Sequence, residues 1–204
     1  MAQLDLVVLS HEDSDHIGGA TTVLETFEVA ALATSLPSSH ALNALAPTAR
    51  RCQAGDGWTW DGVRFEFLHP ASAPVAKRND LSCVLRIGAG EHAMLLTGDI
   101  ERGGEAAMLA GARALRSDVL LVPHHGSRTS STPEFVAGVA PRWAVVPVGY
   151  RSRFGHPNPE VLARYRAADV QVLRTDLQGA ITVRMGESLE VQAERQLRGR
   201  YWLQ

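Results

Sequence analysis

The sequence predicts a layered α/β fold, in which β-sheets are covered by helices. Apolar segments with strand character neighbour one another in hairpins in the first half and alternate with helical segments in the second half, which is typical of such layers. The chain has 204 residues, 45% of them hydrophobic, and this is enough to bury a sizeable core. Because no internal repeat or low-complexity linker interrupts it, we expect residues 1–204 to form a single domain.

The first half is expected to be rich in strands. Residues 4–9 form an apolar run that ends in a polar turn and predicts a buried strand. Ser38 and Ser39 follow Pro37 as typical N-caps and predict a helix over 38–46. Alternation over 63–67 predicts a half-buried strand. The other elements expected here are a helix at 17–26, a turn at 55–57, a strand holding Trp58 and Trp60, and a hairpin of 81–87 and 93–97 joined by a turn at 88–90.

The second half is expected to alternate between helices and strands. An apolar run over 119–123 predicts a buried strand that ends in a polar loop. Pro133 suits the first turn of a helix over 132–139. The remaining expected elements are helices at 101–114 and 159–168 and strands at 143–147, 170–174, 181–184 and 189–193.

Charge is distributed unevenly along the chain. Net charge is −2, but residues 1–100 carry 6 basic and 12 acidic side chains, whereas residues 101–204 carry 14 and 10. The second half therefore offers at most a local basic patch, and global charge does not indicate nucleic-acid binding. No apolar run is long enough to span a bilayer, and from the opening residues we expect no signal peptide. Cys52 and Cys83 lack metal-site spacing; they could form a disulfide only if the fold brings them together, and we expect them instead to be buried free thiols.

Potential metal ligands cluster directly after the first predicted strand. His11, Asp13, Asp15 and His16 fall within six residues, and imidazoles with carboxylates are ligands for divalent cations. By itself this cluster is equally compatible with a polar loop in which Asp15 caps a helix. Asp99, the His124–His125 pair and His156 also follow predicted strands, so a shared site at one rim of the sheets explains all four loops.

The order of these motifs resembles the metallo-β-lactamase superfamily. SHEDSDHIGG, NDLSCVLRI, LLTGDIE, DVLLVPHHGSRTSSTPEFV and FGHPNPEVLARY together resemble the C-terminal domain of ComEC-type competence DNA-uptake channel proteins, as does the closing Arg200–Trp202 segment. The resemblance implies an αββα sandwich that is N-terminally incomplete here, because the family's first strands are missing. It also implies that the chain is a fragment of a larger membrane protein.

The same resemblance implies a centre with one or two divalent ions. One ion would be held by Asp15, His16, Asp99 and a histidine of the 124–125 pair, for which we favour His124. His11 and Asp13 would hold a second ion, with Asp99 bridging. Carboxylate-rich ligands favour Mn²⁺ first and Zn²⁺ second. Asp13 stands where most members have histidine, and a mid-chain histidine ligand is missing, since His69 lies in the wrong local context; both features argue against β-lactam hydrolysis.

The implied activity is hydrolysis of DNA phosphodiester bonds, with degradation of the non-transported strand during DNA uptake. Asp15, His125 and His156 are the catalytic candidates; His156 suits protonation of the leaving oxygen or contact with the phosphate, or is simply a loop histidine. Ser127, Arg128, Arg151 and Arg153 are candidate phosphate contacts, solvated charge being the alternative for the arginines.

The expected partners are single-stranded DNA and the membrane channel portion of the same protein family. The expected location is a soluble domain at the extracytoplasmic face of the membrane. Alternative functions are hydrolysis of a small phosphodiester or ester and a catalytically vestigial docking domain. The sequence leaves the oligomeric state open.

Overall fold

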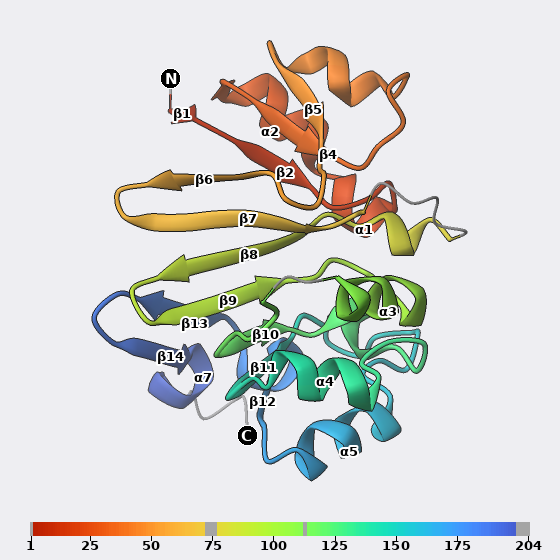
Figure 1. Ribbon diagram of the computed structural model, residues 1–204, viewed down its shortest axis with the longest axis vertical. Coiled ribbons are helices and arrows are strands. Elements are labelled where there is room, and N and C mark those ends of the chain that lie inside the picture. The colour runs from red at the N-terminus through yellow and green to blue at the C-terminus, as the bar shows by residue number, and fades with distance from the viewer. Residues whose placement is uncertain (1, 72–76, 112–113, 199–204) are drawn as a thin grey trace.

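Two β-sheets lie face to face between two layers of helices. The computed structural model describes residues 2–71, 77–111 and 114–198. Figure 1 shows β2, β4 and β5 with helix α2 at one end of the molecule and β10–β12 with α4 and α5 at the other, with β6–β9 between them. The predicted αββα layering is confirmed. Three clusters of buried apolar side chains, one between the sheets and one on the outer face of each sheet, hold the layers together.

The larger sheet has seven strands in the order β12-β11-β10-β9-β8-β7-β6. Strands β6 to β9 pair antiparallel, and β9 to β12 pair parallel. The strands are β6 (Gly57–Trp60), β7 (Val63–His69), β8 (Val84–Ala89), β9 (His92–Leu96), β10 (Val119–Leu121), β11 (Trp143–Val146) and β12 (Gln171–Arg174).

The smaller sheet has three parallel strands in the order β2-β4-β5, which are β2 (Val7–Leu9), β4 (Leu32–Thr34) and β5 (Ala49–Arg51). Two further pairs complete the strands of the described residues: β1 (Gln3–Leu4) beside β3 (Glu28–Val29), and the hairpin of β13 (Ile181–Met185) and β14 (Leu189–Ala193).

Alternating side chains of the central strands β7, β8 and β9 pack into two different apolar clusters, one on each face of the large sheet. In β7, Phe67 packs toward the small sheet with Leu85 of β8, whereas Leu68 joins the cluster that contains Val84 on the opposite face. This follows from the two-residue period of a strand. The outer cluster is closed by α3 (Arg102–Ala110), α4 (Pro133–Val139) and α5 (Pro159–Ala167).

The other face of the small sheet is covered by α2 (Ala20–Thr26) and the 3-10 turn η1 (Ala41–Leu45), through Leu24 and Leu42. The remaining short helices are α1 (Ser14–Ile17), η2 (Asn79–Leu81), η3 (Pro123–Gly126), α6 (Thr175–Gln178) and α7 (Glu194–Leu197). Within the described residues no helix is long and apolar enough to cross a membrane.

Several predicted boundaries were wrong. The strand expected at 4–9 is divided between β1 and β2, and the helix expected at 17–26 is divided into α1 and α2 by Gly18 and Gly19. The helix expected at 38–46 is only a 3-10 turn, and that expected at 101–114 ends at Ala110 within the described residues. The Arg200–Trp202 segment lies outside the described residues.

A disulfide joins the two sheets, and the prediction of free thiols was wrong. Cys52 follows β5 and Cys83 precedes β8, and their sulfurs are bonded with the Cα atoms 5.7 Å apart. Both residues are buried in the cluster between the sheets, as expected of cysteine. The pairing arises because packing of the small sheet on β7 and β8 brings together residues that are 31 positions apart in the sequence.

Candidate metal centre

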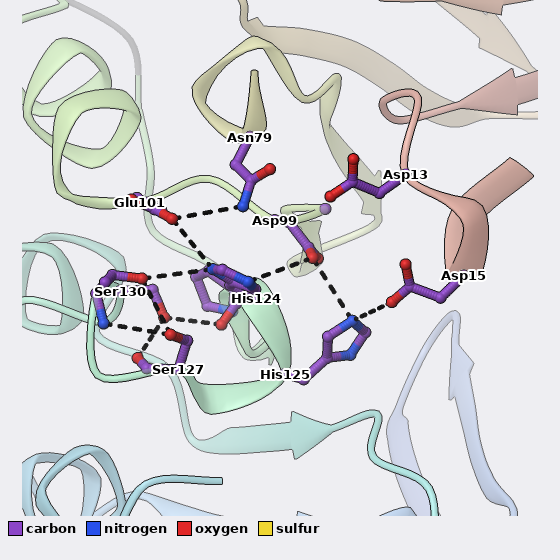
Figure 2. A network of polar contacts seen from close by, with 12 residues as sticks. Asp13, Asp15, Asn79, Asp99, Glu101, His124, His125, Ser127 and Ser130 are labelled. Atoms are coloured by element: carbon purple, nitrogen blue, oxygen red, sulfur yellow. Dashed lines mark hydrogen bonds and ion pairs between the residues drawn. The ribbon is translucent and has the colours of Figure 1, made fainter. Parts of the chain in front are cut away.

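The predicted ligand loops meet at one edge of the two sheets. His11 to His16 follow β2, Asp99 follows β9, and His124 and His125 follow β10. Figure 2 shows Asp99 between the loop of Asp13 and Asp15 and the two histidines. The shared site expected from the sequence is therefore formed from both sheets, with Asp99 at its centre.

Four side chains form a compact group: Asp15, His16, Asp99 and His125. One ligand atom from each lies within 4.8 Å of the others. His16 Nε2 is 3.2 Å from Asp99 Oδ1, and His125 Nε2 is 3.1 Å from Asp15 Oδ2 and 3.6 Å from Asp99 Oδ2. Two imidazoles and two carboxylates converging in this way are a suitable ligand set for a divalent cation.

His11 and Asp13 lie beside this group. His11 Nε2 is 3.8 Å from Asp99 Oδ2 and 3.6 Å from Asp13 Oδ2, and its ring centroid is 4.1 Å from that of His16. Asp13 Oδ1 also accepts a hydrogen bond from Arg78 at 3.1 Å. Asp99 therefore has His11 and His125 near its Oδ2 atom and His16 near its Oδ1 atom, so this one carboxylate contacts both the compact group and the His11–Asp13 pair.

The hydrogen bonds behind the imidazoles leave their Nε2 atoms available to a cation. His125 Nδ1 is 2.7 Å from the carbonyl oxygen of Pro147. A carbonyl only accepts, so Nδ1 carries a hydrogen, and Nε2 is the ring nitrogen that a bound cation would contact. Nδ1 of His11 and His16 lie 3.2 and 3.0 Å from the Ser10 hydroxyl oxygen, and the buried Nε2 atoms of both have no hydrogen-bond partner among the described residues.

This arrangement fits a divalent cation. Lone pairs on nitrogen facing carboxylate oxygens are unfavourable unless a positive charge lies between them, and buried polar atoms are rarely left unpaired. When the hydrogens of His11 and His16 both lie on Nδ1 and bond to Ser10, both Nε2 atoms face Asp99 as lone pairs. Ser10 therefore orients the two rings, a role that sequence reasoning missed although the residue directly precedes His11.

The charges in the group favour ligation at Asp99 and His11. Burial opposes ionisation of Asp99, but His16, His125 and His11 outweigh it and lower the pKa of this carboxyl. Burial, together with the charge of His16, lowers the pKa of His11, so the neutral form of its ring is favoured. For His16, burial lowers the pKa, but the close Asp99 carboxylate with Asp15 and Asp13 raises it overall, so a proton competes with a cation there.

The structure places His125, rather than the favoured His124, in the compact group. His124 Nε2 is 3.9 Å from Asp99 Oδ2, and its Nδ1 faces Glu101 Oε1 at 3.5 Å. The backbone explains the difference: His124 and His125 have φ values of 49° and 53°, and Gly126 one of 79°. This left-handed run turns the adjacent imidazoles apart, so that their centroids are 6.4 Å apart.

Gly98 allows the Asp99 loop to approach the His11 loop. Its φ is 53°, and a Cβ there would lie 2.9 Å from Ser82 Cβ and 3.0 Å from Ser10 Cβ. Ser82 Oγ in turn accepts a hydrogen bond from the Asp99 backbone N–H at 3.1 Å. The glycine before Asp99 is thus required by close packing as well as by backbone conformation.

The segment Asn79–Ser82 supports the centre, although it contributes no residue to the compact group. Asn79 donates to Glu101, and Asp80 Oδ1 accepts from the backbone N–H groups of Glu101 and Gly104 at 2.7 and 2.8 Å. His69 Nε2 lies 2.6 Å from the Asp80 carbonyl oxygen and therefore donates to it. The exclusion of His69 from the predicted ligands agrees with this position.

Cavities adjoin the group on the side of the loop after β11. One of about 260 Å³ is lined by Asp13, Asp99, His124, Arg153 and His156 among others. A larger one of about 520 Å³ extends from Asp15 and His125 along residues 147–156 and includes Arg151. The rings of His156 and His124 are 5.8 Å apart, and burial with the charges of His124 and His125 lowers the pKa of His156.

The other predicted phosphate contacts lie outside these cavities. Ser127 is buried and shares a hydrogen bond with Thr129, so its hydroxyl organises its own loop. Arg128 is exposed and lines neither cavity. In Figure 2, Ser127 and Ser130 lie beyond His124, away from Asp15.

Comparisons with known proteins identify the family to which the chain is related. A family model described as the metallo-beta-lactamase superfamily matches residues 2–149. Competence protein ComA of Neisseria gonorrhoeae is 40% identical over 194 residues, covering 95% of this chain and 27% of that protein. ComE operon protein 3 of Bacillus subtilis is 32% identical over 191 residues, covering 89% and 25%. The chain thus spans about a quarter of the length of these relatives.

Among solved structures, CmlA, a diiron beta-hydroxylase from Streptomyces venezuelae, is similar in fold. The TM-score is 0.54 at 12% sequence identity, and the match covers 85% of this chain and 44% of that one. The expected similarity to competence proteins is confirmed by the sequence comparisons, and the structural match supports the fold.

Proposed function

The chain belongs to the metallo-beta-lactamase superfamily, and we propose that it is a metal-dependent hydrolase that cleaves DNA phosphodiester bonds. The observation that carries this proposal is the group of two imidazoles and two carboxylates whose ligand atoms lie within 4.8 Å of one another, beside a cavity lined by Arg151 and Arg153. The similarity to proteins named for competence supports degradation of the non-transported strand during DNA uptake as its role.

Asp15, His16, Asp99 and His125 would hold one divalent ion, and His11 with Asp13 would hold a second against Asp99. Bound divalent ions supply a nucleophile from water at neutral pH and neutralise charge on phosphoryl oxygens. Mn²⁺ is our first choice, because a group rich in carboxylates suits harder ions, and Zn²⁺ is the second.

The chain's own residues would position the substrate. Arg153 lines both cavities and Arg151 the larger one, where guanidinium groups bind phosphate oxygens through paired N–H donors. His156 lines both cavities beside His124 and is placed to donate a hydrogen bond or a proton to an oxygen of the phosphodiester.

We further propose that the chain acts at the extracytoplasmic face of the membrane, together with the channel portion of the same protein family. The Cys52–Cys83 disulfide supports this location, because disulfides persist in oxidising compartments and are rare in the cytosol.

A nuclease assay with Mn²⁺ tests the proposal. We expect cleavage of DNA by the wild-type chain, loss of cleavage on chelation, and loss of both cleavage and Mn²⁺ binding in Asp99→Ala. Asp5→Ala, which removes an exposed carboxylate outside the group, is the matched control and should cleave normally. Turnover of a small phosphodiester without cleavage of DNA would refute the DNA substrate, and undiminished cleavage by Asp99→Ala would refute the assigned centre.

A further inference from the structure

The loop between β11 and α5 presents two aromatic side chains to solvent next to the metal centre. Tyr150 is 72% exposed and Phe154 is 68% exposed, more than the other exposed large apolar side chains of the described residues. Single exposed apolar residues are ordinary on protein surfaces. Two aromatic residues within one short loop, both lining the cavity that reaches Asp15 and His125, indicate a ligand-binding surface.

A neighbouring arginine lies near each of these rings. The guanidinium carbon of Arg151 lies 5.2 Å from the Tyr150 ring centroid, and that of Arg153 lies 4.9 Å from the Phe154 centroid. Within the part of the chain that the structure describes, neither arginine has a carboxylate partner, in contrast to Arg78, which pairs with acidic side chains. The loop therefore presents flat π-surfaces together with positive charge that no acid neutralises.

A series of rings connects this loop to the centre. Phe154 stacks on His156 with centroids 6.1 Å apart and planes inclined by 23°, and His156 lies 5.8 Å from His124. Arg153, Phe154 and His156 also line the smaller cavity together with Asp99. A ligand that rests on Phe154 is thus directed toward the carboxylates of the metal centre.

We propose that Tyr150 and Phe154, with Arg151 and Arg153, form a stacking platform for unpaired bases of single-stranded DNA. This inference rests on the proposed function and specifies its substrate: the bases lie on the aromatic and guanidinium planes, and the backbone runs toward Asp15 and Asp99. Aromatic rings interleaved with arginines bind single strands in this way because every base has a π-face. The bases of an intact duplex are stacked on each other, so their faces are not available.

The proposal is tested by binding in the presence of a chelator, which separates it from cleavage. A fluorescently labelled oligothymidylate, an abasic oligonucleotide of equal length and a DNA duplex are compared by anisotropy. The wild-type chain should bind the oligothymidylate best. The double variant Tyr150→Ala/Phe154→Ala should lose on the order of 5- to 100-fold in affinity for it, the range expected for loss of base stacking. Its affinity for the abasic strand should not change.

Matched variants make the result specific. Leu197→Ala removes an exposed apolar side chain outside both cavities and should leave all three affinities unchanged. Tyr150→Phe should bind as the wild type does, because the ring is kept. In Phe154→Trp, the added indole emission should be quenched by the oligothymidylate but not by the abasic strand, a readout that does not depend on a destabilising substitution.

The outcomes distinguish this inference from the proposed function. Equal affinities for single strand, abasic strand and duplex, or unchanged binding in the folded double variant, would overturn the platform even if the wild-type chain cleaves DNA. Stacking-dependent binding without cleavage in Mn²⁺ would instead support the stacking platform and refute the proposed nuclease activity.

Discussion

Asp80 is expected to couple the stability of the fold to the metal centre. Asp80 is 3% exposed, and its carboxylate accepts hydrogen bonds from the backbone N–H groups of Glu101 and Gly104 at the start of α3. The space for it exists because residue 103 is glycine: a Cβ at Gly103 would lie 2.6 Å from Asp80 Oδ2. Glu101 is two positions beyond Asp99, so the same hydrogen bonds fix the backbone that carries the central ligand.

Replacing Asp80 by alanine should lower the free energy of unfolding by about 3 kcal/mol, because two buried N–H groups lose their acceptor at about 1–3 kcal/mol each and packing relaxes in part. Asp80→Asn retains one carbonyl acceptor but loses the charge that favours a helix N-terminus, and should cost about 1–2 kcal/mol. Both variants should also bind Mn²⁺ more weakly than the wild type, and Asp80→Ala should lose more affinity than Asp80→Asn.

Urea unfolding followed by circular dichroism measures the first effect, and calorimetric titration with Mn²⁺ measures the second. Glu187→Ala, at an exposed turn position, is the control and should fall within 0.5 kcal/mol of the wild type, about the usual range for surface changes. An Asp80→Ala variant within 1 kcal/mol of the wild type, about the usual size of a single hydrogen bond, would refute the reasoning.

Three further predictions concern the centre and the disulfide. His125→Ala should weaken Mn²⁺ binding on the order of 100-fold or more in calorimetric titration and His124→Ala clearly less, because only His125 belongs to the compact group; the reverse order would restore His124 as the ligand. Ser10→Ala should weaken Mn²⁺ binding about 10- to 100-fold by freeing both ring nitrogens, with little change in unfolding, and unchanged affinity would contradict its orienting role. Replacing Cys52 and Cys83 by serine should lower the free energy of unfolding by about 3.5 kcal/mol, since the bond closes a segment of 31 residues; unchanged urea midpoints with and without reductant would argue against the bond.

Local patterns predicted a layered α/β fold and the gathering of the ligand loops at one rim, whereas the αββα order of the layers came from the resemblance to the metallo-β-lactamase superfamily. Alternation in 63–67 marked β7, and the apolar run before His124 marked β10. Ligand residues directly after strands predicted a shared rim, since the ends of parallel neighbours such as β9 and β10 lie together. Which of the two histidines joins the compact group was harder to predict. His124 and His125 are equivalent in sequence, and only the left-handed backbone distinguishes them.

Features that depend on distant residues were not predictable. The three-residue strands β4 and β5 are too short to show a period, and they are defined by pairing with β2. The disulfide requires knowledge of how the two sheets pack. Asp80 is a helix cap whose N–H donors lie 21 and 24 positions away, so no local capping pattern reveals it.

The left-handed run at His124, His125 and Gly126 has a consequence for how this fold can change. Non-glycine residues held in this backbone region cost about 1–3 kcal/mol each, so glycine at position 124 or 125 would make the fold more stable. The same exchange would delete an imidazole from the centre. A more stable backbone at either position would therefore come with the loss of an imidazole beside Asp99, so stability and the ligand set are in conflict at these two histidines.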